Sequence, residues 1–451
     1  WVGFGMRLLD EFLRFYNMPD RRKLCEAVGI HREQVIREST RMWVERFHWW
    51  GQYDREIRFT DKVLDRLEDC FIDREENAAT FGIIYALRTL ALAVLEGHNP
   101  QAIEEARAAL DRLPPAEQST PQALLARARL CTAIGYQLRL GGHLAPAAEM
   151  YVQAKTAFLK MGGAHAGYQD EYAMLLNNLA FVYARQGQMV LARPLGHEAL
   201  QINERIGNEY STGLTLSTLS QVALMRENYA QALTYAEEAL ALFRDLKDPH
   251  GMALAYQGVA RARRRMARHE IEKGRALEEP QQQLEATIED LDRALQIAQE
   301  ARLSSDIPDL RAERGRVSRD LGHIVSQGEG LEKAMVHYRQ SERELRQALE
   351  NKELDMLTQA DILQDLAETL FYAKDEMGAR QCLTQVETLV GLEQRDKVGE
   401  QIALDALSPE AYSALRKVEM LRGHMAFSRE ALTEGLRHYV LAYAYLVRFS
   451  P

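Results

Sequence analysis

The sequence predicts an all-α fold, and three observations support this prediction. The composition is rich in Leu, Ala, Glu, Arg and Gln, which favour helices. Val, Ile and Thr never form the alternating runs that are typical of half-buried strands. A pattern of two amphipathic helices joined by a short turn recurs along the chain. With 46% hydrophobic and 27% charged residues, the chain is expected to be globular.

The first segment, residues 1–75, does not follow the recurring pattern and is predicted to be a helical cap or connector. Its apolar periodicity predicts helices near 5–16, 20–28, 31–49 and 54–71. The segment concentrates aromatic residues, namely Trp43, Phe47, Trp49, Trp50 and Tyr53. Two interpretations stay open: a core that closes the end of the repeat array, or a docking surface for another part of the polypeptide.

The recurring pattern is clearest between residues 131 and 242. The stretch NNLAFVYARQGQMVLARPLGHEALQI (177–202) holds two apolar stripes separated by Gly187, which is placed to turn the chain. Forty residues later, 216–242 repeats the stripes, with Ser220 in the place of Ala180. The stretch 131–158 carries the same spacing of small residues. These are three consecutive helix–turn–helix pairs with small residues where the helices approach closely.

Further pairs extend the array on both sides, so that residues 76–451 are predicted to form one repeat region. Near 267–281, the interval between corresponding residues grows from 40 to 55, which indicates about 15 inserted residues. The insertion is either a flexible elaboration or an arm that binds a partner. The predicted outer pairs are 81–113, 252–300, 361–389 and 422–446.

The spacing of the small residues resembles that of the tetratricopeptide repeat (TPR) family. Ala180, Ala192 and Ala199 match the family's eighth, twentieth and twenty-seventh positions. The 40-residue spacing exceeds the common repeat of about 34 residues. It is similar to the longer repeats of kinesin light chains and of many bacterial regulators. The resemblance implies a right-handed α-α superhelical solenoid, whose first helices line a concave wall.

No motif for catalysis or for a cofactor is recognisable. No phosphate-binding loop with its Lys is present, and His197-Glu198 lacks the second His of a zinc protease motif. The four cysteines, Cys25, Cys70, Cys131 and Cys382, lie far apart and are predicted to be free thiols in a reducing, cytoplasmic compartment. We therefore predict a non-enzymatic chain with no catalytic residues, no metal and no cofactor.

Candidate binding residues follow from the repeat register, which places one face of each first helix on the concave wall. The register assigns to this wall Arg, amides and aromatics, and Asn178 matches the sixth position, where peptide-binding TPR proteins commonly carry Asn. Adjacent repeats lack that Asn, so a multi-Asn clamp for a C-terminal carboxylate is incomplete. The candidates are Arg129, Tyr136, Arg139, Asn177, Asn178, Phe181, Arg185, Gln221, Arg261, Arg264 and Arg265.

The segment RARRRMAR (261–268) holds five arginines in eight residues, and two interpretations compete for it. The arginines either face the wall as a site for carboxylate or phosphate, which Arg binds in a bidentate manner, or they pair with acidic residues of the insertion. Those acidic residues are Glu270, Glu272, Glu278 and Glu279.

The net charge of −10 argues against a general nucleic-acid binder. No apolar stretch is predicted to reach the roughly 20 residues that span a bilayer, so no membrane partner is expected. The predicted partner is a protein or peptide, acidic in character, or an anionic small molecule.

A chain that begins at Trp1 is expected to be a piece of a longer protein. Its architecture resembles the C-terminal sensor of a bacterial STAND-type signalling ATPase, which implies an intramolecular contact with a preceding domain. Two other functions remain open: a passive scaffold or cargo adaptor, and the regulatory half of a fused protease or other effector enzyme.

Overall fold

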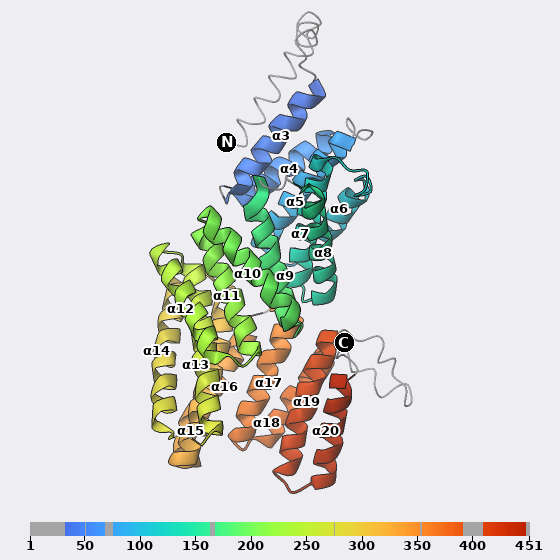
Figure 1. Cartoon of the computed structure of the whole chain (residues 1–451). Coiled ribbons are helices and arrows are strands. Elements are labelled where there is room, and N and C mark those ends of the chain that lie inside the picture. Colours follow the sequence, from blue (N-terminus) through green and yellow to red (C-terminus); the bar gives the residue numbers. More distant parts are fainter. Residues whose placement is uncertain are drawn as a thin grey trace, which may run out of the picture. The chain divides into compact units, whose positions relative to one another are not determined.

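The computed structural model describes residues 32–49, 51–67, 75–162, 167–274, 276–351, 354–390 and 409–447. Within these residues the chain forms helices and no strands (Figure 1). The all-α prediction is therefore confirmed. The helices are α3 (Arg32–Trp49), α4 (Tyr53–Leu67), α5 (Glu75–Glu96), α6 (Pro100–Asp111), α7 (Pro121–Leu140), α8 (Leu144–Lys160), α9 (Gln169–Arg185), α10 (Met189–Ile206), α11 (Glu209–Met225), α12 (Tyr229–Asp245), α13 (Pro249–Glu272), α14 (Glu278–Glu300), α15 (Ile307–Gly328), α16 (Leu331–Leu349), α17 (Met356–Tyr372), α18 (Glu376–Leu389), α19 (Pro409–Phe427) and α20 (Leu432–Val447).

The chain divides into two compact units, Trp1–Tyr183 and Ala184–Pro451, here called unit 1 and unit 2. Within each unit, helices that follow one another pack as hairpins, for example α7 with α8 and α11 with α12. First helices of neighbouring pairs also pack together, as α5 does on α7 and α13 does on α15. This is the arrangement of stacked helix pairs in a solenoid.

Small side chains occupy the positions where paired helices approach. In unit 2, Ala192, Ala199, Ala232 and Ala239 are fully buried. Ser220 is buried as well, and its hydroxyl donates to the carbonyl oxygen of Ala232 at 2.7 Å. The repeated small residues of the sequence thus allow close packing of helices in this fold.

Local signals set where helices end and where the next ones begin. Gly187 takes a positive φ of 79° between α9 and α10, a conformation that glycine adopts without strain. Asn208 and Asn228 cap α11 and α12 by accepting from backbone N–H groups of the first turn. The hairpin boundaries therefore follow from short-range sequence features.

The aromatic residues of the first segment contribute to a core. Trp43 and Phe47 of α3 are buried, and the Phe47 ring lies 5.7 Å from that of Phe59 on α4. Both helices pack against α5. These contacts support the interpretation that α3 and α4 belong to a core at the end of the array. The helices expected near 5–16 and 20–28 lie outside the described residues.

The insertion lengthens two helices. α13 has 24 residues and α14 has 23, whereas α11 and α12 have 17 each. α13 continues to Glu272, and α14 begins at Glu278. The expectation of a flexible elaboration near 267–281 is therefore wrong for most of this stretch.

One helical hairpin, α15 with α16, was not among the pairs predicted from the sequence. Gly315 and Gly322 of α15 let it approach α16, because a Cβ at either position would lie 2.8 Å from Leu345 or Tyr338. The small residues here are glycines rather than alanines, and the insertion shifts them out of the 40-residue register. The periodicity therefore did not reveal this pair.

The expectation that no apolar stretch is long enough to span a bilayer is wrong for helix α5. Its segment Ala78–Glu96 is long and apolar enough, by length and composition, to cross a membrane. Residues such as Ile83, Ile84 and Ala86 are nevertheless buried, and α5 packs against α7. These contacts are those of a core helix of unit 1.

Candidate functional site

The predicted site residues all lie on first helices of the pairs. In unit 1 they are Arg129, Tyr136 and Arg139 on α7, and Asn177, Asn178 and Phe181 on α9. In unit 2 they are Arg185 at the end of α9, Gln221 on α11, and Arg261, Arg264 and Arg265 on α13.

Arg129 is buried and fully engaged within unit 1. Its Nε and Nη2 donate to the two carboxylate oxygens of Glu171 at 2.8 and 2.6 Å, and its Nη1 donates to Glu45 at 2.9 Å. Burial acts to lower the pKa of Arg129, but the two carboxylates raise it above its usual value. Arg129 therefore ties α7 to α9 and α3, and its N–H groups are not available to a ligand.

Arg139 has different surroundings on the same helix. Its guanidinium carbon lies 4.6 Å from the ring centroid of Tyr136 and 5.1 Å from that of Phe181. Both distances are typical of cation–π contacts. Among the described residues, Arg139 has no carboxylate partner, and its Nε is buried without an acceptor. The structure thus brings together three predicted residues around an unpaired cation, here called the Arg139 clamp.

The two asparagines of α9 are half-buried. The Oδ1 of Asn177 is buried and accepts no hydrogen bond from the described residues. Asn177 lies one helical turn before Phe181 and therefore on the same face of α9. An amide in this position offers an acceptor on the face that carries the clamp.

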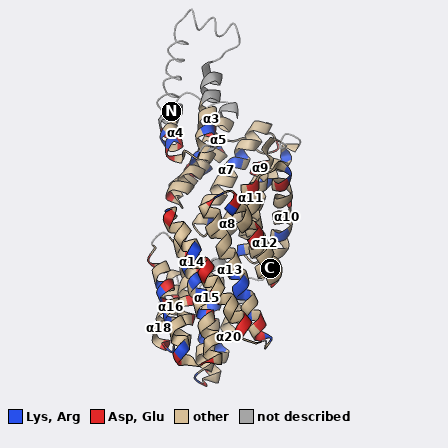
Figure 2. Cartoon of the chain, turned by 90° about the vertical axis from the view of Figure 1, so that its left-hand side faces the viewer, with Lys and Arg blue, Asp and Glu red and all other residues tan. Residues whose placement is uncertain are grey.

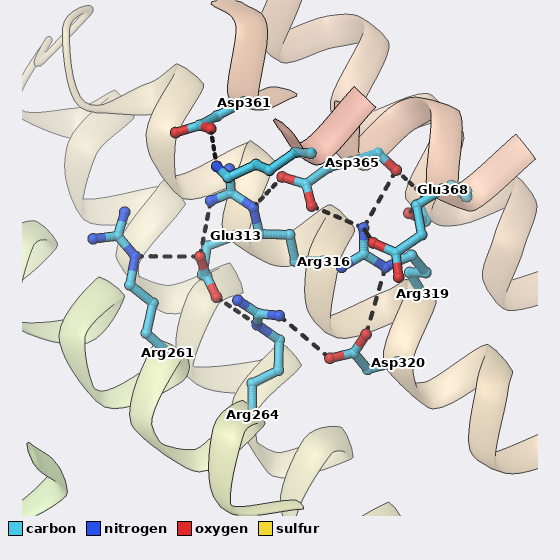
Figure 3. Close-up of polar contacts among 12 residues, drawn as sticks. Arg261, Arg264, Glu313, Arg316, Arg319, Asp320, Asp361, Asp365 and Glu368 are labelled. Carbon is cyan, nitrogen blue, oxygen red and sulfur yellow. Dashed lines mark hydrogen bonds and ion pairs between the residues drawn. The ribbon is translucent and has the colours of Figure 1, made fainter. Parts of the chain in front are cut away.

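Unit 2 contains a buried network of arginines and carboxylates across α13, α15 and α17 (Figure 3). Glu313 of α15 is completely buried. Its oxygens accept from Nε of Arg264 at 2.9 Å, from Nη1 of Arg316 at 3.0 Å and from Nε of Arg261 at 3.3 Å. Three arginines thus converge on one carboxylate.

Asp320 is the second acidic residue of α15 in this network. It accepts from Nε of Arg268 at 2.6 Å and from Nη1 of Arg264 at 3.4 Å. Arg264 therefore bridges Asp320 and Glu313, which lie two turns apart on α15. The two carboxylates hold α13 against α15 along successive turns.

The network continues from α15 to α17. Arg316 donates to Asp365 at 2.5 Å, and Arg319 donates to the same carboxylate at 2.8 Å. Arg319 also pairs with Glu368 at 2.9 Å. Because α15 supplies both acids for α13 and bases for α17, it joins the three first helices.

The charges of this network shift the pKa values of its acids. Burial acts to raise the pKa of Glu313, but Arg264, Arg316 and Arg261 outweigh it and hold the pKa at about 2. The pKa values of Asp320 and Asp365 are likewise lowered by their arginine partners against the effect of burial. All three carboxylates are therefore charged near neutral pH.

These contacts revise the interpretation of the 261–268 arginines. Arg261, Arg264 and Arg268 pair with α15, and Arg263 pairs with Asp290 of α14 and Glu237 of α12. Their partners are not the acids of the insertion, so that expectation is wrong for these pairs. Arg264 is buried as well, which corrects its assignment to an open wall.

Three arginines at one edge of the network, Arg261, Arg265 and Arg185, are incompletely paired with carboxylates among the described residues. Arg261 is 25% exposed, and its one ion pair among the described residues is the 3.3 Å contact to Glu313. Arg265 and Arg185 are exposed and form no ion pair among the described residues. Burial lowers the pKa of Arg261, and the charges of Arg316 and Arg185 act in the same direction while Glu313 opposes them. Gln221 is half-buried on α11.

Sequence reasoning missed the acidic half of the network, because it found no pair around α15. A signal was present in the run ERGRVSRD (313–320), where acidic and basic residues recur at three- and four-residue intervals on one helical face. Figure 2 shows such basic and acidic residues interspersed along the helices of unit 2.

Acid should destabilise unit 2. Glu313 has a folded pKa of about 2 and an ordinary value of 4.5, so its contribution is present above about pH 4.5 and is lost as the pH falls toward 2. This difference corresponds to roughly 3 kcal/mol. Hydrogen exchange of α13 and α15, measured from pH 5 to pH 2, should show a loss of protection. A Glu313→Gln variant should show a weaker dependence; equal slopes in both proteins would contradict this assignment.

The described part of the chain shows no arrangement of side chains for metal binding. No group of three His, Cys, Asp or Glu side chains is arranged to hold a metal ion there. Cys131 and Cys382 are buried free thiols, and burial raises the pKa of Cys131 to about 12. Cys25 and Cys70 lie outside the described residues.

Comparison with known proteins supports the fold. The sequence profile of the tetratricopeptide repeat family matches residues 171–245. No curated protein matches the chain significantly. The chain is similar to a Rap protein complexed with Competence and Sporulation Factor, with a TM-score of 0.59 and 13% identity over 91% of this chain and 98% of that one.

Two further solved structures are similar at the level of the fold. The apo form of RapI gives a TM-score of 0.54 at 10% identity, over 91% of this chain and 98% of that chain. Aspartyl phosphate phosphatase F from Bacillus subtilis gives 0.50 at 13% identity, over 91% and 93%. The chain is thus an all-α solenoid of helical repeats, of which residues 171–245 match the tetratricopeptide repeat family.

Proposed function

We propose that this chain is a sensor module that binds an acidic segment of a protein or peptide on the first helices of its repeats. In a longer polypeptide, it would regulate a fused signalling ATPase of the STAND type. The observation that carries the binding proposal is the surplus of positive charge at Arg185, Arg261 and Arg265 in unit 2.

The surplus of positive charge arises because three arginines share the single carboxylate of Glu313. Arg264 and Arg316 are each neutralised by a second acid, Asp320 and Asp365 respectively. Arg261 shares Glu313 with both of them at the longest of the three distances, 3.3 Å. An incoming carboxylate would supply the negative charge that Arg261 lacks, through charge-assisted hydrogen bonds.

Rigidity of the surroundings favours this role. Arg264, Arg316 and Arg319 fix the backbone of α13, α15 and α17 beneath the surplus arginines. A site whose support is already ordered loses less entropy on binding. The Rap protein of similar fold was solved with Competence and Sporulation Factor, which supports a role of this fold in holding a partner.

Neutralising the surplus arginines should weaken binding of an acidic probe. We expect the Arg261→Gln/Arg265→Gln variant to bind a fluorescein-labelled hexaglutamate peptide at least tenfold more weakly than the parent protein. The salt dependence of its affinity should also be flatter, because fewer charges are screened. Fluorescence anisotropy from 50 to 300 mM NaCl measures both quantities.

Arg343→Gln is the matched control, since Arg343 is exposed on the second helix α16 and forms no ion pair among the described residues. It should bind the probe as the parent protein does. Arg264 is unsuitable for this test because it is buried between Glu313 and Asp320. Equal binding by the double variant and the parent would refute the proposed site.

The regulatory part of the proposal is supported by architecture. The long-period repeats follow a non-repeat helical segment, and buried thiols suit a reducing cytoplasm. The sequence of the full-length gene product provides the test. A nucleotide-binding domain there, whose ATP hydrolysis changes when the acidic partner is added, is the expected result; a coiled coil would instead support an adaptor.

A further inference from the structure

Unit 1 contains a site of a different kind, centred on the Arg139 clamp. We infer that Arg139, Tyr136, Phe181 and Tyr151 form a receptor for a single carboxylate group of a bound peptide. The inference rests on the proposed function only in that the carboxylate belongs to the bound partner. It uses none of the arginines of unit 2.

Arg129, on the same helix, is an arginine whose charge is fully paired. It donates two parallel hydrogen bonds to Glu171 and a third to Glu45. Arg139 has none among the described residues, although its side chain is partly buried. Its terminal nitrogens are not among the buried atoms that lack a partner, so they reach solvent.

The clamp is surrounded by buried polar atoms that lack partners. Tyr151 is fully buried, and its hydroxyl finds no acceptor for its proton within the described residues. It reaches the clamp because residue 135 is glycine, where a Cβ would lie 2.8 Å from the Tyr151 ring. Burial raises the pKa of Tyr151, and the nearby charge of Arg139 opposes that effect. The hydroxyl therefore stays protonated and can donate.

The great majority of buried polar groups in proteins are paired, so the unpaired Tyr151 hydroxyl and Asn177 Oδ1 indicate a missing partner. The nature of the atoms defines it. Arg139 only donates, and the hydroxyl of Tyr151 has a proton that no described residue accepts, whereas the Oδ1 of Asn177 needs a donor. A peptide residue offers both, a carboxylate and a backbone N–H.

The charge and shape of the clamp select a carboxylate over phosphate. One guanidinium supplies a single positive charge, and the electron-rich faces of Tyr136 and Phe181 lie within 5.1 Å of its carbon. A doubly charged phosphate would be only half neutralised beside these rings. A planar carboxylate matches the parallel N–H groups at the free edge of the guanidinium.

The test follows the 19F NMR signal of 4-fluorophenylalanine placed at position 181 of the whole chain. N-acetylglycine, which has a terminal carboxylate, and N-acetylglutamic acid α-amide, which has a side-chain carboxylate, should each shift the signal on titration. Whichever binds more tightly identifies the source of the carboxylate. N-acetylglycine amide should leave the signal unchanged, and inorganic phosphate should bind at least tenfold more weakly.

Variants of Arg139 separate recognition from folding. Arg139→Gln should abolish the shift, and Arg139→Lys should weaken it at least tenfold because the N–H fork is lost. Arg139→Lys keeps a cation beside the two rings and should leave the melting temperature unchanged, whereas Arg139→Gln should lower it only slightly, since it loses the cation–π contacts but no ion pair among the described residues. Arg107→Gln, at an exposed position on α6 without an ion pair in the described structure, is the control and should titrate as the parent does.

The inference is overturned if the amide shifts the signal as N-acetylglycine does, if phosphate binds more tightly, or if the shift survives in Arg139→Gln. A lower melting temperature for Arg139→Lys, which keeps the charge beside the rings, would assign the residue a structural role instead. The 19F titration can fail while Arg261→Gln/Arg265→Gln still weakens hexaglutamate binding. That result would refute the carboxylate receptor and leave the proposed function standing. The reverse pattern leaves the carboxylate receptor and removes the site in unit 2.

Discussion

Glu313→Gln should cost unit 2 about 3–5 kcal/mol of stability, because it leaves buried arginines without their shared countercharge. Arg261, Arg264 and Arg316 all donate to this one carboxylate, which is completely buried on α15. Glutamine keeps the size and one oxygen acceptor, so the variant isolates the lost charge. Urea unfolding, with hydrogen exchange of α13 and α15, measures the effect.

Two further variants make the result interpretable. Adding Arg261→Gln to Glu313→Gln should recover part of the loss, since one of the competing arginines is removed with the acid. Glu342→Gln removes a more exposed acid, which pairs with Arg346 one turn along α16 at 2.8 Å. It should cost less than about 1 kcal/mol. A similarly small cost for Glu313→Gln would show that the network does not hold the three helices together.

Phe243→Ala should destabilise unit 2 by about 3–5 kcal/mol, through lost burial and the cavity left behind. The Phe243 ring is fully buried at the end of α12. It fills the space over two glycines on adjacent helices, because a Cβ on Gly213 would lie 2.7 Å from the ring and one on Gly251 only 2.1 Å. The same urea and hydrogen-exchange measurements apply.

The glycines provide a test of this packing. Gly213→Ala alone should be destabilising, since its methyl group meets the ring. In the Phe243→Ala background the same methyl group should be tolerated and should partly fill the cavity. Val190→Ala, at a position 86% exposed, should change stability by no more than about 0.5 kcal/mol. Additive costs for Phe243→Ala and Gly213→Ala would contradict the packing described.

The regular helix pairs could be predicted from sequence because their determinants are local. Gly187 turns the chain, Asn228 caps α12, and Ala192 and Ala199 recur at helical spacing. Each acts within a few residues of its own position, so periodicity and capping reveal it. The hairpin of α15 and α16 escaped prediction because Gly315 and Gly322 replace the expected alanines and the insertion breaks the register.

Residue types on the first helices were also predictable, but their partners were not. The register placed Arg129, Arg139 and Arg261 together on one wall, yet their structural surroundings differ. Arg129 meets Glu171, Arg139 meets the aromatic rings of Tyr136 and Phe181 and the buried Tyr151, and Arg261 shares Glu313. Helical periodicity gives the face on which a side chain lies, but not the charge that lies across from it.

The sequence by itself therefore determined the all-α class, the hairpin boundaries and the concentration of arginines on the first helices. Only the tertiary structure decided which of those arginines are neutralised. Arg264 and Glu313 are 49 residues apart, and Arg319 and Asp365 are 46 apart. Stacking of successive first helices brings such residues together, and this stacking depends on how the insertion is absorbed into α13 and α14. Long-range pairing of charges is thus a property of the packed array, whereas helix formation is a property of each segment.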